Sequence, residues 1–147
     1  MIIDKEGIIK IENLEIIITP IFTVDDMKNA LTLHSDDIRF RGSNSGYDRY
    51  LIKRILIDDT FWSGLFIFYN SKIAYIGIHH YRITSSPPWE TEASDKKMYD
   101  KLLLEQHGAI KITYIWGTIT SSIDTKIRGG SIIITYNNFP IKPRDAH

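Results

Sequence analysis

The stretch KITYIWGTITSSIDTKIRGGSIIITY, residues 111–136, decides how the rest of the sequence is interpreted. In its first part, Ile112, Tyr114 and Trp116 alternate with Lys111, Thr113 and Ile115, and Ile110 just before the stretch continues the series. In the second part, Ile132, Ile134 and Tyr136 recur with the same period of two. Side chains on one face of a β-strand recur with this period. The stretch therefore predicts two β-strands joined by a polar loop with serines, an aspartate and paired glycines.

The polar residues of this loop raise the question of a catalytic serine. A serine nucleophile needs a base such as histidine within reach, and commonly a sharp turn that supplies amide donors. No histidine occurs between His107 and His147, and no G-x-S-x-G elbow surrounds the serines. We therefore interpret the hydroxyl cluster as the turn of a hairpin. The cluster comprises Thr118, Thr120, Ser121, Ser122, Asp124 and Thr125.

Earlier segments show the same strand period. Residues 61–69 and 73–81 predict a hairpin, because a short polar connection separates two apolar runs. Residues 7–19 predict two short strands or one bulged strand, and residues 50–57 predict another strand. Residues 42–46, GSNSG, predict a flexible loop. Residues 23–37 are ambiguous between a short helix capped by Thr23 and a strand.

One segment, at about residues 95–107, has a clear helical pattern. Ser94 is a candidate cap at its start, and Gly108 is a typical stop. At the helical period, one face of this segment is apolar and is expected to pack on the sheet; it comprises Met98, Tyr99, Leu102 and Leu103. Leu104 falls on the other side, where either a loop covers it or a partner binds it.

The composition supports a sheet-rich fold. The chain has 28 isoleucines and 5 alanines, and isoleucine favours strands whereas alanine favours helices. The 147 residues, of which 43% are hydrophobic, are enough for one domain with its own core. We predict an α+β fold in a single domain over residues 1–147. It has a mostly antiparallel sheet of about six or seven strands, with one principal helix (about 95–107) packed on one face.

Charge and sequence patterns narrow the function. The 18 basic and 18 acidic residues balance, which argues against direct binding of nucleic acid. The absence of cysteine excludes disulfides and thiolate chemistry and fits a reducing compartment. The sequence shows neither a signal peptide nor an apolar run long enough for a membrane span. We expect a cytoplasmic protein that binds no membrane, no metal and no cofactor.

The adjacent histidines His79 and His80 are the best candidates for catalysis. Adjacent strand residues point to opposite faces of a sheet, so the two cannot readily hold one metal ion. One of them, together with Arg82, would suit a small metal-independent nuclease. A second alternative is a small-molecule-binding α+β domain, whose pocket the aromatic residues of 61–69 would line. Neither alternative assembles a convincing catalytic set, so we expect a binding protein rather than an enzyme.

Acidic residues beside an aromatic residue point to a protein interface. Aromatic side chains supply buried anchors, and charges at the rim of an interface speed association. The segment WETEASD, residues 89–95, has this composition, and it predicts a basic protein partner. The predicted partner-binding residues are Trp89, Glu90, Glu92, Asp95, Asp100 and Leu104, with Asp58 and Asp59 as a second group.

Residues 85–136 also carry a family resemblance, over about a third of the chain. PPW stands before a helix, and YIWGTITSSIDTK and GGSIIITY follow. These motifs resemble immunity proteins of contact-dependent growth inhibition and related bacterial polymorphic toxin systems. The residues involved are Pro87, Pro88, Trp89, Trp116, Gly117, Ser121, Ser122, Asp124, Lys126, Ser131 and Tyr136. The resemblance implies a non-catalytic inhibitor that binds a cognate toxin domain, frequently a nuclease, and occludes its active site or substrate surface.

Overall fold

The computed structural model describes residues 2–57, 60–80, 88–124 and 129–138, which form two sheets and two α-helices. In chain order the elements are β1 (Ile2–Ile3), β2 (Ile9–Ile11), a short 3-10 helix (Glu12–Leu14), β3 (Ile16–Ile18), α1 (Val24–Leu33), β4 (Ile38–Asn44), β5 (Tyr47–Ile57), β6 (Thr60–Tyr69), β7 (Lys72–His80), α2 (Pro88–His107), β8 (Lys111–Tyr114), β9 (Gly117–Asp124) and β10 (Gly129–Tyr136).

The two sheets are antiparallel. The larger sheet has seven strands in the order β4-β5-β6-β7-β10-β9-β8, and the smaller has three in the order β1-β2-β3. Every pair of neighbouring strands in these two orders runs antiparallel. The predicted α+β class and the predicted number of strands are confirmed.

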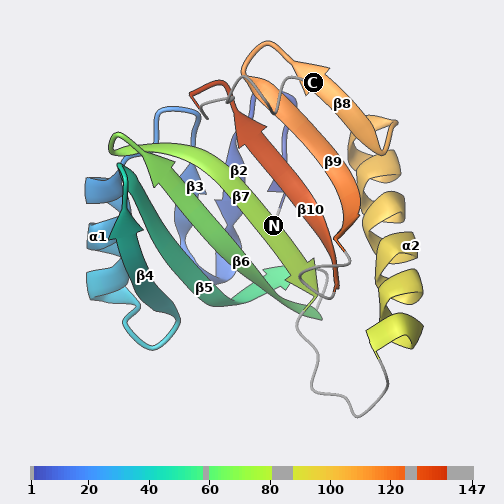
Figure 1. Ribbon diagram of the computed structural model, residues 1–147, viewed down its shortest axis with the longest axis horizontal. Helices are drawn as coiled ribbons and strands as arrows, with labels where there is room; N and C mark the ends of the chain where they lie inside the picture. Colours follow the sequence, from blue (N-terminus) through green and yellow to red (C-terminus); the bar gives the residue numbers. More distant parts are fainter. Residues whose placement is uncertain (1, 58–59, 81–87, 125–128, 139–147) are drawn as a thin grey trace.

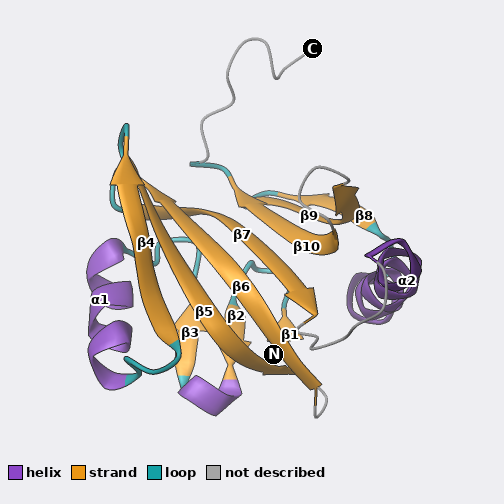
Figure 2. Ribbon diagram, turned by 60° about the horizontal axis from the view of Figure 1, so that its bottom comes forward, coloured by secondary structure: helices purple, strands orange, loops and turns teal. Residues whose placement is uncertain are grey.

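The small sheet and both helices lie on the same face of the seven-stranded sheet. Figures 1 and 2 show β1–β3 behind the large sheet, with α1 at one edge and α2 at the other. The core fills the space between these layers. Ile52, Ile78 and Ile132, which belong to one register row, are fully buried on this side, and α2 adds Tyr99 and Leu103. No described helix or strand covers the opposite face, which we call the open face (Figure 1).

Several local predictions are confirmed. β6 and β7 form the expected hairpin, with Asn70 and Ser71 both at positive φ in its turn. Residues 7–19 form the two short strands β2 and β3, separated by the 3-10 helix. The ambiguous segment 23–37 contains α1, which begins after Thr23 as the helical alternative required.

The interpretation of the hydroxyl cluster as a hairpin turn is wrong for most of its residues. Thr118, Thr120, Ser121 and Ser122 lie inside β9, and Thr125 lies outside the described residues. The first strand also ends earlier than predicted, because the chain turns after Tyr114, and Tyr114 pairs with Gly117. Small hydroxyl residues are compatible with this strand because Thr118 and Thr120 lie on the open face, where they need no apolar partner.

The prediction of a flexible loop at residues 42–46 is also wrong. Residues up to Asn44 belong to β4, and the connection to β5 is the two-residue turn of Ser45 and Gly46. Both residues have positive φ, 55° and 86°, as a tight hairpin turn requires. A β-bulge between Phe40 and Ser43 accommodates the extra residues.

The principal helix is longer than predicted. α2 begins at Pro88 rather than near residue 95, so Ser94 is inside the helix and is not its cap. Proline fits the first helical position, since it lacks an N–H that would have no intrahelical partner there. The expected inner face is confirmed, with Tyr99, Leu102 and Leu103 buried. Leu104 is 53% exposed, so the alternative in which a loop covers it is wrong.

Three residues of the family resemblance have structural roles, and two of them, Trp116 and Tyr136, hold the N-terminal loop in place. The indole N–H of Trp116 donates a hydrogen bond to the Lys5 carbonyl at 2.8 Å, and the Tyr136 hydroxyl donates to the Gly7 carbonyl at 3.0 Å. Burial raises the pKa of Tyr136 strongly, so this hydroxyl keeps its proton. Gly117 is required because a Cβ there would lie 2.0 Å from the Thr135 carbonyl oxygen. These residues therefore support the fold.

Candidate functional site

The predicted interface on α2 is described only in part. The side chains of Trp89, Glu90, Glu92 and Asp95 lie outside the described residues, as do Asp58 and Asp59. Leu104 is exposed as a partner-binding residue should be. Asp100 is half-buried and bonds to Lys96 at 2.5 Å. Burial alone would raise the pKa of Asp100, but hydrogen bonds from Lys96 and Ser121 lower it. The α2 interface stays a prediction.

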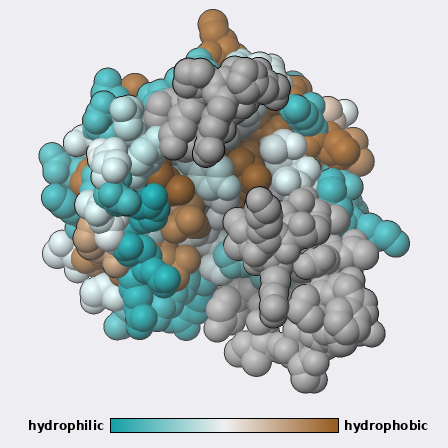
Figure 3. Space-filling view, viewed as in Figure 1, coloured by the Kyte–Doolittle hydropathy of each residue, from teal (hydrophilic) through white to brown (hydrophobic). Residues whose placement is uncertain are grey.

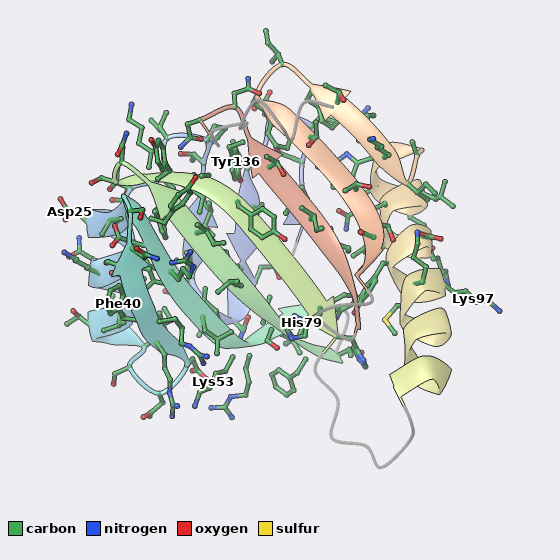
Figure 4. All side chains as sticks on the ribbon, viewed as in Figure 1. Asp25, Phe40, Lys53, His79, Lys97 and Tyr136 are labelled. Atoms are coloured by element: carbon green, nitrogen blue, oxygen red, sulfur yellow. The ribbon has the colours of Figure 1, made fainter. Side chains whose placement is uncertain are left out.

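The two adjacent histidines point to different sides of β7, as predicted. His79 is exposed at the end of β7 (Figure 4), where its Nε2 lies 3.2 Å from the Ser63 hydroxyl. His80 is half-buried against the ring of Trp62 on the core side, with 5.5 Å between ring centroids. Arg82 lies outside the described residues. The two histidines therefore do not converge on one site, and the nuclease alternative stays a prediction.

Two findings concern metals and membranes. Within the residues that the structure describes, no three histidine or carboxylate side chains lie close enough together to hold a metal ion. In that same part of the chain, neither helix is long and apolar enough to cross a bilayer.

The charges of this neutral protein are segregated between its two layers. Residues 2–37, which form the small sheet and α1, hold eight carboxylates and three lysines. The described part of strands β4–β7 holds six basic side chains and the single carboxylate of Asp48. The eight acidic residues are Asp4, Glu6, Glu12, Glu15, Asp25, Asp26, Asp36 and Asp37; the six basic ones are Arg39, Arg41, Arg49, Lys53, Arg54 and Lys72. The negative charge of the protein is thus concentrated in the N-terminal layer.

Helix α1 forms at one edge of this acidic layer because its start is well capped. The Asp26 amide donates to the Thr23 hydroxyl at 3.3 Å, and the Thr23 amide donates to the Asp26 carboxylate at 3.0 Å. The helix is also joined to the β6–β7 turn, because the Val24 amide donates to the Ser71 carbonyl at 2.9 Å. Val24 and Met27 anchor it in the core. Its outward side is therefore held in a fixed position.

Exposed apolar side chains gather around α1. Leu33 at its end is 79% exposed, Ile21 in the preceding loop 77%, Ile17 on β3 57% and Phe40 on β4 51%. These are four of the eight large apolar side chains that are exposed in the described part of the chain. Single exposed apolar residues are common, but a group of them near one element indicates an interaction site.

Two hollows flank α1. The first, of about 200 Å³, lies between β3 and α1 and has an apolar floor that includes Leu14, Phe22 and Ala30, with Ile17 and Leu33 at its sides. We call it the β3–α1 hollow. Its polar lining comes from Glu15, Asp26, Asn29 and His34.

The second hollow, of about 450 Å³, lies between α1 and β4–β5, and we call it the acidic hollow. Asp25, Asp48 and the ring of Phe40 line it, with Lys28 as the cation among its lining residues. Tyr50 also lines it, with its ring centroid 5.1 Å from that of Phe40. Burial raises the pKa of the Tyr50 hydroxyl, and the charges of Asp48 and Asp25 raise it further. Carboxylates beside aromatic rings form a favourable setting for a cationic side chain.

We use the name α1 surface for Ile17, Ile21, Leu33 and Phe40 together with the carboxylates Glu15, Asp25, Asp26 and Asp48. Figure 4 shows Asp25 and Phe40 at the same edge of the molecule, far from Lys97 on α2. The surface has the anatomy of a protein interface, with apolar anchors and charged residues around them.

The open face is the other extended surface. Across its middle, Leu51, Leu65, Gly77 and Ile133 are successive partners in the register of β5, β6, β7 and β10. Apolar surface is visible on this side in Figure 3. Arg39 of β4 pairs with Leu51 and so extends this row to the edge of the sheet. The positive charge of Arg39 suits an acidic partner better than a basic one.

Sequence reasoning placed the candidate interface on residues 89–104 and at Asp58 and Asp59, and it missed the α1 surface. The apolar residues of this surface are ordinary strand and helix residues in the sequence, where nothing separates exposed from buried isoleucines. The available signal was the ambiguous period of residues 31–33, in which Leu31 and Leu33 do not fit one helical face. Leu31 packs against the core, whereas Leu33 faces solvent.

Comparison with known proteins gives no family assignment for this chain. No family model matches the chain, and neither a curated protein nor a solved structure matches it.

Proposed function

We propose that this chain is a non-catalytic inhibitor that binds a cognate toxin domain through the α1 surface and occludes the active site or substrate surface of that domain. One observation carries the proposal: half of the exposed large apolar side chains of the described residues surround α1, and carboxylates line both adjacent hollows. The resemblance of residues 85–136 to immunity proteins supports the same function. The inhibitor acts in the cytoplasm.

Stable binding requires both the apolar side chains and the carboxylates of the α1 surface. Covering the four apolar side chains contributes roughly 1–2 kcal/mol each, or about 4–8 kcal/mol in total. Association itself costs about 4–15 kcal/mol in lost freedom of motion, so apolar burial alone gives a weak complex. Ion pairs between the carboxylates of the α1 surface and basic groups of the partner supply specificity and fast association.

A nuclease is the kind of toxin domain that fits this surface best. A protein that cleaves nucleic acid must bind phosphates, and it does so with lysine and arginine side chains. The acidic hollow, with Asp25 and Asp48 beside the rings of Phe40 and Tyr50, suits one such side chain. Binding there would withdraw a phosphate-binding group from the substrate.

The test uses the product of the neighbouring gene, which the proposal expects to be a secreted protein with a toxic C-terminal domain; that domain is purified for the assay. We expect a stable complex in which the toxic activity of that domain is lost, and an association rate that falls as salt is added. Asp25→Lys should slow association and weaken its salt dependence. The matched control is Arg49→Glu on the sheet, which reverses a charge outside the α1 surface and should leave association with a basic partner unslowed. Absence of binding at about 1 μM would refute the proposal.

A further inference from the structure

The acidic hollow contains a buried phenol without a hydrogen-bond partner. Tyr50 is only 3% exposed, yet no described residue makes a hydrogen bond with its hydroxyl. Its ring is held in place by the rings of Phe40 and Phe68, with 5.1 Å and 5.7 Å between centroids. A buried polar group normally has a partner. Because Tyr50 lines the hollow, a ligand bound there is able to supply that hydrogen bond.

Two carboxylates from different elements act on this hydroxyl. Asp25 belongs to α1 and Asp48 to β5, and both line the hollow. Burial raises the pKa of the Tyr50 hydroxyl, and the charges of Asp48 and Asp25 raise it further, so the hydroxyl keeps its proton. Within the described residues, neither carboxylate forms an ion pair. The hollow therefore offers a cation two negative charges and a neutral phenol.

A β-bulge in β4 brings these groups to the same side of the sheet. Phe40 pairs with Tyr50 and Ser43 pairs with Asp48, so two residues of β4 lie opposite one residue of β5. Residues three apart in a regular strand point to opposite faces, and the extra residue of the bulge turns Phe40 and Ser43 to the same face. The Ser43 hydroxyl donates a hydrogen bond to Asp48 Oδ1, which leaves the other carboxylate oxygen to a ligand.

This arrangement fits a guanidinium group better than an ammonium group. A guanidinium is planar and weakly hydrated, stacks on aromatic rings and carries five N–H donors, whereas an ammonium is a compact and strongly hydrated charge. The guanidinium has enough donors for both carboxylates and the Tyr50 hydroxyl, and the half-exposed Phe40 ring offers it a stacking surface. Val24 and Leu31 line the hollow as well and suit the methylene groups of an arginine side chain.

Lys28 is a lining residue whose charge opposes this ligand. It is exposed, and it forms no ion pair with Asp25 or Asp48. Its flexible four-carbon stem allows the ammonium group to turn toward solvent when another cation enters. Removal of the Lys28 charge should therefore strengthen binding of a cation, whereas removal of a carboxylate should weaken it.

We infer that the acidic hollow is a guanidinium-binding site and that the toxin domain inserts an arginine side chain into it, between α1 and the β4–β5 hairpin. This inference rests on the proposed function, since it names the group that the partner presents to the α1 surface. It adds chemical specificity, because an arginine is captured tightly and a lysine in its place only weakly.

The experiment is an NMR titration of the full chain with three capped tripeptides, which carry arginine, lysine or citrulline between two glycines. Citrulline keeps the shape of arginine without its charge. We expect the arginine peptide to shift the ring signals of Phe40 and Tyr50 and to bind with a Kd of about 1 mM. The lysine peptide should bind at least about fivefold more weakly, and the citrulline peptide at least about tenfold more weakly.

Substitutions in the hollow separate its parts. Tyr50→Phe keeps the ring, so it should weaken the arginine peptide about tenfold without lowering the unfolding midpoint. Asp48→Asn keeps an acceptor for Ser43 and should weaken the peptide to a similar degree. Lys28→Gln should strengthen it. The matched control is Tyr47→Phe, on the same strand but on the open face, which should change the affinity by less than about twofold.

Equal affinities for the arginine and citrulline peptides, or for the arginine and lysine peptides, would overturn the inference. Failure of the arginine peptide to bind at about 10 mM would also overturn it. A toxin-domain complex that depends on Asp25 but not on Tyr50 or Asp48 would leave the proposed function intact and refute the guanidinium site. Selective binding of the arginine peptide by a chain that forms no toxin complex would establish the guanidinium site and refute the proposed function.

Discussion

Gly7 is a position where a single added methyl group should clearly lower the stability of the fold. Its φ of +80° is unfavourable for other residues, and an added Cβ would lie 2.6 Å from Cδ2 of Trp116. The Trp116 ring has little freedom to move away, since its N–H is bonded to the Lys5 carbonyl and Tyr114 stacks on it at 5.5 Å. Alanine at position 7 therefore incurs backbone strain and a steric overlap together.

The magnitude follows from these two contributions. A non-glycine residue in the left-handed region costs about 1–2 kcal/mol, and forcing an extra methyl group into a packed site costs about 1–3 kcal/mol. Alanine also reduces the entropy of the unfolded chain, which recovers about 0.4–1 kcal/mol. We expect Gly7→Ala to lower the free energy of unfolding by about 2–4 kcal/mol.

Gly108 provides a matched control, because its φ of +76° is nearly the same and no atom lies within 4 Å of its ideal Cβ position. Gly108→Ala should cost about 1 kcal/mol, from backbone strain alone. The assay is urea unfolding followed by tryptophan fluorescence, with unchanged m-values as the check for two-state behaviour. Equal losses for the two variants would refute the packing of Gly7 against Trp116.

The remaining predictions concern the hydrogen bond of Tyr136 and the protonation of His107. Tyr136→Phe removes the hydroxyl that donates to the Gly7 carbonyl and leaves that carbonyl without this partner. The free energy of unfolding should therefore fall by about 1–3 kcal/mol in the same urea assay. An unchanged free energy of unfolding would contradict the hydrogen bond. Burial lowers the pKa of His107, whose Nδ1 lies 2.7 Å from the Tyr114 hydroxyl. Below the usual histidine pKa of about 6.5 the unfolded chain takes up a proton that the folded chain does not, so stability should fall as pH decreases from about 6.5 to the lower pKa of the folded state. His107→Gln should flatten this part of the stability curve, and an unchanged slope would show that another group causes it.

Much of the fold follows from local pattern. The β6–β7 hairpin could be predicted because apolar residues alternate on both sides of a polar connection. The inner face of α2 could be predicted because Tyr99, Leu102 and Leu103 recur at the helical period. In both elements the pattern in the sequence directly reflects burial on one side.

Other elements could not be predicted because their patterns depend on distant partners. β9 looks like a loop in the sequence, since its serines and threonines do not show that Thr120 pairs with Ile133 of β10. The turn of Ser45 and Gly46 is hidden because a serine at positive φ has no distinct sequence signal. The start of α2 was missed because the PPW motif was taken to precede the helix, whereas Pro88 is its first residue.

The candidate site is the least predictable feature. Leu33 and Ile17 are exposed because of the way α1 and β3 lie against the core, and this is a property of the whole fold. The acidic hollow joins Asp25 of α1 to Asp48 of β5, which are far apart in the sequence. Acidic residues beside an aromatic residue indicated a protein interface in the sequence but did not lead to the α1 surface.

Two exposed helical leucines allow the most direct test of the central claim. Leu33 belongs to the α1 surface, and Leu104 belongs to the interface predicted on α2. The measurement is the affinity of the purified toxin domain for Leu33→Gln and for Leu104→Gln, with each variant checked for an unchanged unfolding midpoint. If α1 carries the interface, Leu33→Gln weakens binding by about tenfold or more, while Leu104→Gln stays within about threefold of the unmodified protein. The opposite pattern, or no effect of Leu33→Gln, would contradict the account.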